Sequence, residues 1–185
     1  MNTWLFALRR DPVCKSAHHQ LFAALGNDGE DWKSSEPRKV QFVELEGTII
    51  ARATQKPKTV PSKEYSLSVS AGDTLDIRVL LPGMKRERYH VMKNGDTYSR
   101  KSCAKTGQEM QDSIPAWLER MGCTGTVDLV RQGVVRMARP LPSVEAWTLQ
   151  GTVTVLDAER FMQAWTYGIG RLRTYGFGMI REQKR

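Results

Sequence analysis

The first seventy residues alternate between short apolar runs and one amphipathic segment. The apolar runs predict four strands, at residues 3–8, 40–45, 48–54 and 64–69. Leu21, Ala24 and Leu25 recur at helical spacing, so residues 15–25 predict a helix. Two prolines within residues 56–63 favour a linker, or a degraded helix, before the fourth strand. The predicted order is strand, helix, strand, strand, remnant helix, strand.

The second half of the chain repeats this order with longer elements. Strands are predicted at residues 74–81, 126–138, 145–156 and 177–182, and helices at residues 107–122 and 158–168. Pro115 allows a kink or a late start in the first of these helices. The simplest arrangement is an α+β fold of two tandem ferredoxin-like (βαββαβ) domains with antiparallel sheets, at residues 1–70 and 71–185. The first domain would have a degraded second helix.

Positive charge is concentrated in residues 84–105. The chain has 28 Lys and Arg against 20 Asp and Glu, a formal net charge of +8, and this segment contains Lys85, Arg86, Arg88, Lys93, Arg100, Lys101 and Lys105. Asn94-Gly95 is a strong signal for a two-residue turn, so the segment predicts a basic hairpin. Its cations would face the phosphates of an RNA stem, since double-stranded RNA is recognised through phosphates, 2′-OH groups and shape. A solvated surface loop is the alternative interpretation.

A glycine-rich loop follows the last predicted helix, at residues 168–178. Its glycines and arginines are Gly168, Gly170, Arg171, Arg173, Gly176 and Gly178. The loop lacks the third glycine of a dinucleotide fingerprint and the GK[ST] of a phosphate-binding P-loop. Two interpretations remain. The loop is either a tight helix-to-strand turn or a backbone surface that RNA approaches closely, with arginine forks that hold phosphates.

Several classes of protein are disfavoured by the sequence. Cys14, Cys103 and Cys123 form no CxxC pair and no zinc pattern, so we expect reduced thiols. No clustered DxD or HxxxH set is present, and we expect neither a metal nor another cofactor. No apolar run approaches the roughly 18 residues that span a bilayer, and the first residues do not resemble a secretory signal. We therefore expect a cytoplasmic protein with no membrane partner.

Residues 147–180, WTLQGTVTVLDAERFMQAWTYGIGRLRTYGFGMI, resemble the C-terminal end of CRISPR repeat-processing endoribonucleases. The resemblance is to the type I-E (Cascade) kind, within the repeat-associated RNA-binding superfamily. That family ends in GIGxxKxxGxGLL, and Arg173 stands here where the lysine is usual. The resemblance extends to AGDTLDIRVLLPGMKRERYHVMKNG, to IPAWLERMGC and to KSAHHQLFAAL, in the same order along the chain.

The resemblance implies metal-independent cleavage of precursor CRISPR RNA below the stem of a repeat hairpin. In this family the ribose 2′-OH attacks the adjacent phosphate and leaves a 2′,3′-cyclic phosphate and a 5′-OH. Placing the family's YxxHxxL segment on residues 15–25 puts His18 at the catalytic histidine, with His19 as the fallback. Lys15 stands at the tyrosine position, and Arg139 is the candidate for the family's second catalytic cation. The histidines could instead be a surface pair.

The resemblance also implies partners. The protein would bind the CRISPR repeat RNA hairpin (crRNA) through the basic hairpin and the glycine loop, and would then remain bound as a subunit of a CRISPR effector complex. Two alternatives stay open. One is a non-catalytic subunit that caps the 3′ hairpin of the guide RNA, with a type IV system as one setting for it. The other is an unrelated RNA-binding protein, for which the repeat hairpin would be irrelevant.

Overall fold

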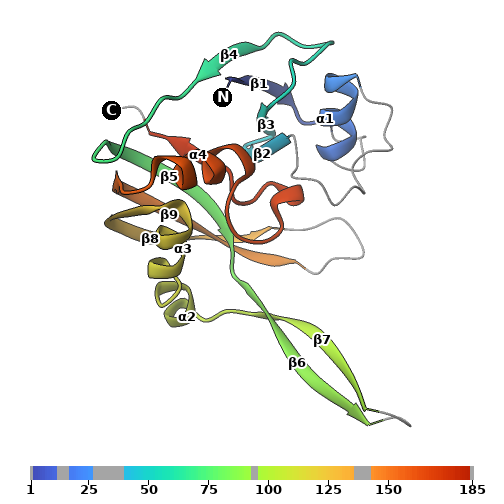
Figure 1. The fold of residues 1–185 in the computed structure, drawn as a ribbon. Coiled ribbons are helices and arrows are strands. Elements are labelled where there is room, and N and C mark those ends of the chain that lie inside the picture. The colour runs from blue at the N-terminus through green and yellow to red at the C-terminus, as the bar shows by residue number, and fades with distance from the viewer. Residues whose placement is uncertain (1, 12–16, 27–39, 93–95, 136–142, 184–185) are drawn as a thin grey trace.

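The computed structural model describes residues 2–11, 17–26, 40–92, 96–135 and 143–183 of the 185-residue chain (Figure 1). At residues 2, 18, 86–92, 96–102 and 174 the description covers the backbone alone. No helix among the described residues is long and apolar enough to cross a membrane.

The first half is a four-stranded antiparallel sheet with one helix on its face. Its elements are β1 (Asn2–Arg9), α1 (Ala17–Leu25), β2 (Val40–Leu45), β3 (Thr48–Ala53) and β4 (Lys63–Ser66). The strands lie in the order β2-β3-β1-β4. The apolar face of α1, including Leu21 and Leu25, packs on Phe6, Phe42 and Ile49. The predicted helix and four strands are therefore present.

The second half is a larger sheet of the same kind. Its strands are β5 (Thr74–Pro82), β8 (Cys123–Val135), β9 (Val144–Val155) and β10 (Ile180–Glu182), in the order β10-β5-β9-β8. The helices are α2 (Gly107–Gln111), α3 (Ile114–Met121) and α4 (Ala158–Tyr167). They pack on the sheet through buried residues such as Met121, Phe161 and Trp165.

Several predicted elements differ in extent from the structure; the strand predicted at residues 64–69, for example, ends at Ser66. The single helix expected at residues 107–122 is divided into α2 and α3, and Pro115 lies in the first turn of α3. Proline lacks a backbone N–H and is favoured in a first turn, so the helix ends and begins again there. The last strand begins at Ile180 instead of residue 177, because residues 177–179 are buried in the end of the glycine loop.

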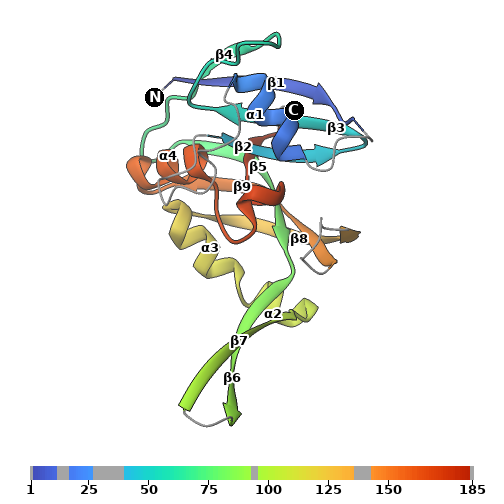
Figure 2. The ribbon, with the colours of Figure 1, turned by 90° about the vertical axis from the view of Figure 1, so that its right-hand side faces the viewer.

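The hairpin of β6 (Met84–Met92) and β7 (Asp96–Ala104) projects from the body of the protein (Figures 1 and 2). The two strands are antiparallel and pair Met84 with Ala104 at the base. Gly83 N–H donates to the carbonyl of Glu145 at 2.7 Å, and Lys105 N–H donates to the carbonyl of Gly83 at 3.0 Å. The predicted basic hairpin is thus present and its base is bonded to the second sheet. Its expected turn at Asn94-Gly95 lies outside the described residues.

The two halves are joined by a buried arginine. Arg52, on β3, is only 3% exposed. Its Nη1 donates to the carbonyl of Trp165 at 2.7 Å, and its Nη2 donates to the carbonyl of Ile180. Tyr65 adds a second connection, because its ring stacks with Trp165 and its hydroxyl donates to Glu182 at 2.7 Å. The position of the glycine loop relative to the first sheet is fixed by this junction.

Candidate nucleic-acid interface

The glycine loop turns back on itself after α4 and lies between the two halves. Gly178 has φ +81°, and a Cβ there would lie under 3.0 Å from the carbonyl oxygen of Ile169. A Cβ at Gly176 would lie 3.2 Å from the ring of Phe42 on β2. Both glycines are buried. The chain needs glycine at these two positions so that the loop can close on itself and approach the first sheet.

This burial narrows the surface that the loop offers to a ligand. Under one of the two interpretations Gly176 and Gly178 would present bare backbone to RNA, but the protein's own chain covers both. Gly168 and Gly170 are half-buried, and Arg171 is exposed. The packing role of the last two glycines was missed from the sequence, since Phe42 lies far from them along the chain.

The two arginines of the loop differ in what they contact. Arg173, in the short 3₁₀ turn η2 (Arg173–Tyr175), donates from Nη1 to the carbonyl of Tyr167 at 2.9 Å. Its guanidinium therefore closes the loop onto the end of α4. Arg171 makes no hydrogen bond or ion pair with any other described residue, and its side chain is exposed. Arg171 is the loop cation left to bind a ligand.

The loop also lies against the base of the basic hairpin and against α1. Phe177 packs with Val144 and Ala146 on the second sheet, and Gly178 N–H donates to the carbonyl of Leu80 at 2.7 Å. These contacts bring the loop to the base of the basic hairpin. On its other side, η2 lies against α1, the helix that carries His18 and His19.

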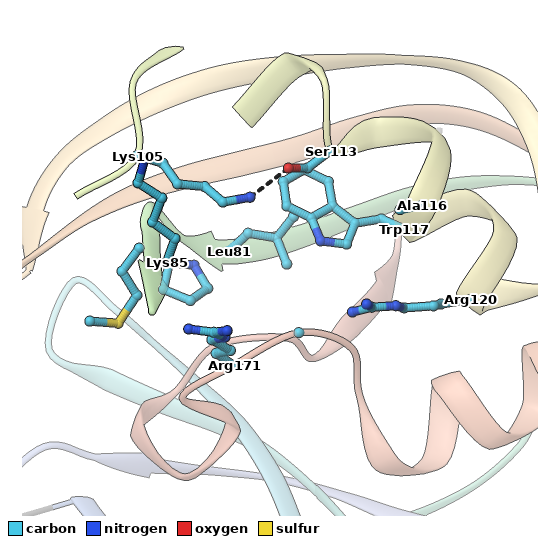
Figure 3. A pocket seen from close by; sticks show the side chains of 11 residues that line it. Leu81, Lys85, Lys105, Ser113, Ala116, Trp117, Arg120 and Arg171 are labelled. Carbon is cyan, nitrogen blue, oxygen red and sulfur yellow. Dashed lines mark hydrogen bonds between the residues drawn. The ribbon is translucent and has the colours of Figure 1, made fainter. Parts of the chain in front are cut away.

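A hollow of about 190 Å³ opens where the hairpin base, α3 and the glycine loop meet (Figure 3). Its floor includes Leu81 and the indole of Trp117. Four cations line it: Lys85, Lys105, Arg120 and Arg171. They come from β6, from the segment after β7, from α3 and from the loop. We refer to this hollow as the basic pocket.

Lys105 contacts a hydroxyl and an aromatic ring of the basic pocket, and its pKa is lowered there. Its Nζ donates to the hydroxyl of Ser113 at 2.5 Å and lies 5.5 Å from the centre of the Trp117 ring. Burial lowers the pKa of Lys105, and the positive charges of Arg171, Lys85 and Arg120 lower it further, whereas Glu109 opposes the shift. A cation next to three others is stabilised when an anion enters among them.

The carboxylate of Glu109 already bonds to one of these cations in the described part of the chain. Lys85 Nζ lies 2.5 Å from Oε1 of Glu109. Glu109 also accepts from the backbone N–H of Thr106 at 2.8 Å, and Thr106 Oγ1 accepts from Glu109 N–H, in a capping box at the start of α2. These hydrogen bonds lower the pKa of Glu109. Glu109 therefore pairs with Lys85, and the four cations around the pocket still outnumber this carboxylate.

Sequence reasoning identified three of the four pocket cations. Lys85, Lys105 and Arg171 were predicted to bind RNA, and the structure places them around one hollow. Arg120 was missed. Helical spacing could have identified Arg120, because it lies three residues after Trp117 on α3 and residues three apart share a helix face. The residues of the hairpin further from its base are Arg86, Arg88, Arg100 and Lys101, on β6 and β7, where the backbone alone is described. Lys93 lies outside the described residues.

The predicted catalytic residues are only partly covered by the structure. His18 lies in α1, where its backbone is described, and the neighbouring His19 is exposed. Lys15 and Arg139 lie outside the described residues. The catalytic assignment therefore stays a prediction. Among the described residues, no group of three or more His, Cys, Asp or Glu side chains could hold a metal ion.

Comparison with known proteins adds a family and a fold. The family described as CRISPR associated protein matches residues 14–181. Thermus thermophilus Cse3, solved bound to an RNA representing a pre-cleavage complex, has a TM-score of 0.69 at 18% identity, with 100% of each chain covered. Cas6e from Escherichia coli K-12 has a TM-score of 0.67 at 15% identity, again with 100% of each chain covered.

A component of a CRISPR RNA-guided surveillance complex is also similar, with a TM-score of 0.63 at 16% identity over 97% of this chain and 98% of that one. At these identities the likeness lies in the fold. A search of curated protein sequences found no match.

Proposed function

This chain belongs to the CRISPR-associated protein family, and on that premise we propose that it binds the hairpin of a CRISPR repeat RNA and cleaves precursor CRISPR RNA without a metal ion. The observation that carries the proposal is the basic pocket at the base of a projecting basic hairpin. A fold shared over its full length with Cse3, which was solved with RNA, supports it.

The fold assignment is part of this proposal. In both sheets the first strand of the half lies between its third and its last strand, in the orders β2-β3-β1-β4 and β10-β5-β9-β8. That order, with helices on one face, is the arrangement of a ferredoxin-like unit. We therefore assign residues 1–70 and 71–185 to two such units, the first without its second helix.

The proposed reaction is an attack of the ribose 2′-OH on the adjacent phosphorus. A base removes the 2′-OH proton, the new P–O2′ bond forms, the P–O5′ bond breaks, and an acid protonates O5′. The products are a 2′,3′-cyclic phosphate and a 5′-OH, with no metal or oxidant needed. His18 would move these protons because an imidazole titrates near neutral pH, with His19 as the fallback. Lys15 and Arg139 would stabilise the negative charge that develops on the phosphate.

A second candidate function is supported by one departure from the family pattern. Lys15 occupies the position of a tyrosine and cannot accept and donate as a neutral hydroxyl does. A chain that has lost cleavage would still cap the 3′ hairpin of the guide RNA, and a type IV system is one setting for it. In both functions the protein remains with the RNA as a cytoplasmic subunit of an effector complex.

Cleavage of the cognate repeat RNA in EDTA tests the two functions against each other. The native protein, His18→Ala, His19→Ala and a substrate with 2′-deoxyribose at the cut site are compared, and binding is measured in parallel. We expect cleavage by the native protein and His19→Ala, cleavage slowed about a hundredfold or more by His18→Ala, and none on the deoxy substrate, with binding retained throughout. Tight binding without a cut at any pH from about 6 to 9 would leave the capping function.

A further inference from the structure

We infer that the basic pocket holds one phosphate group of the bound RNA, gripped by Lys105, Arg120 and Arg171. This inference rests on the proposed function, because it names the part of the RNA that the pocket takes. It assigns a binding role to Arg120, which the sequence pattern did not single out. It also adds Ser113 as the hydrogen-bond partner of Lys105.

The charge of the pocket favours an anion. Four cations line it, and Glu109 pairs with Lys85 and only partly offsets the charge of Lys105. Neither Arg120 nor Arg171 bonds to a carboxylate within the described part of the chain. Besides burial, the positive charges of Arg171 and Arg120 lower the pKa of Lys105, so each lies close enough to Lys105 to repel it. An anion among them would remove that repulsion.

The size and donors of the pocket select a phosphate. A volume of about 190 Å³ is below the roughly 300 Å³ at which sites for whole small molecules begin, so the pocket suits one chemical group and not a nucleotide. The side chains of Lys105, Arg120 and Arg171 extend into it from separate elements (Figure 3). Two guanidinium forks and an ammonium match the several acceptor oxygens of a tetrahedral phosphate.

The position of the pocket points to a phosphate of the RNA backbone and not to a free ion. It lies at the base of the projecting hairpin, next to the exposed cation of the glycine loop. Phosphate contacts fix the register of a protein on a nucleic acid, while they carry no sequence information. One phosphate held here would connect the hairpin, α3 and the glycine loop, and would thereby set the angle between the hairpin and the body.

Binding of the repeat hairpin RNA over a range of salt concentrations tests the inference. Arg120→Gln and Arg171→Gln are compared with Arg160→Gln, an exposed arginine on α4 that pairs with Asp157. We expect each pocket variant to weaken binding about tenfold and to reduce the slope of log K against log salt by about 1, with no change for Arg160→Gln. Thermal melts confirm that all variants are folded.

A scan of the RNA with single methylphosphonates, which are neutral, locates the phosphate. We expect one position at which neutralisation weakens the native protein but has no further effect on Arg120→Gln. Pocket variants that bind like Arg160→Gln, or losses spread evenly over the scan, would overturn the inference and leave RNA binding intact. Inorganic phosphate that stabilises the native protein but not Arg120→Gln, while RNA affinity is the same for both, would assign the pocket to a free ion. A native protein that does not bind the repeat RNA would overturn the proposed function itself.

Discussion

The guanidinium of Arg52 lies 3.8 Å from the centre of the Trp165 ring, across the junction between the two halves of the protein. It also donates to the carbonyls of Trp165 and Ile180, so one side chain from β3 holds the end of α4 and the start of β10. Burial lowers the pKa of Arg52 to about 9. A cation is thus held out of water by carbonyl oxygens and a π-face, and the glycine loop between α4 and β10 is fixed at both ends.

Replacing this arginine should weaken the junction. Arg52→Met keeps much of the apolar stem but leaves the carbonyls of Trp165 and Ile180 buried without their donor. Each buried acceptor left unpaired costs about 1–3 kcal/mol, so we expect a loss of unfolding free energy of at least that size. Urea unfolding measures it, and Arg9→Met, at an exposed position on β1, is the control. Equal stability of the two variants would contradict the role of Arg52.

The closure of the glycine loop makes a second prediction, on Gly178. Gly178→Ala places a Cβ under 3.0 Å from the Ile169 carbonyl oxygen, in addition to a left-handed φ of +81°. Gly72→Ala is a matched control, because its φ is +96° and nothing lies within 4 Å of its Cβ position. We expect Gly72→Ala to cost about 1–2 kcal/mol, the usual penalty of that backbone region, and Gly178→Ala to cost clearly more. Calorimetric melts compare them. Similar costs would show that the loop does not need this close approach.

The low pKa of Lys105 makes RNA affinity sensitive to alkaline pH. An anion binds more tightly to protonated Lys105, so affinity is full below the lowered pKa and falls as pH rises through it. An ordinary lysine, with a pKa of 10.5, loses its charge only at higher pH. Lys105→Arg keeps the charge, and we expect it to remove the decline. Titration with a 2′-O-methylated repeat hairpin, which resists alkaline cleavage, measures both profiles. Identical profiles would exclude Lys105 as the group that titrates.

The proposed catalytic role of His18 makes a kinetic prediction. Proton transfer by a positioned side chain contributes about 10²- to 10⁴-fold to rate, so His18→Ala should slow single-turnover cleavage by about that factor. Binding affinity should stay within about twofold, because the basic hairpin and the basic pocket supply the phosphate contacts. Cleavage rates at several pH values, measured with RNA bound to saturation, separate the two effects. An unchanged rate would move the role to His19 or to a residue outside α1.

Sequence patterns predicted the elements of this fold better than its contacts between distant segments. Alternation located the strands, and Leu21 and Leu25 located the face of α1, because these depend on neighbours a few residues away. Arg52 sits within an apolar strand, and its partners Trp165 and Ile180 lie 113 and 128 residues further on. No local pattern identifies such a pairing.

In the candidate site too, local features were predicted from the sequence and contacts between distant segments were not. The charges of Lys85, Lys105 and Arg171 were visible as a basic excess and as a glycine loop, although their convergence on one hollow depends on tertiary packing. Arg120 was missed because it lies on a helix whose other positions predicted only a core. The glycine loop was recognised in the sequence. The packing of Gly176 on Phe42 and of Gly178 on Ile169 was not, because it depends on how the loop folds back on itself.

The junction at Gly83 has a consequence for how this protein can change over generations. The chain enters and leaves the projecting hairpin at one point, where Lys105 N–H bonds to the Gly83 carbonyl at 3.0 Å. Insertions made in pairs, two residues on each strand, would lengthen the hairpin while every side chain near the base kept its face. The length of the protein hairpin can therefore change by a few codons while the body of the protein stays as it is.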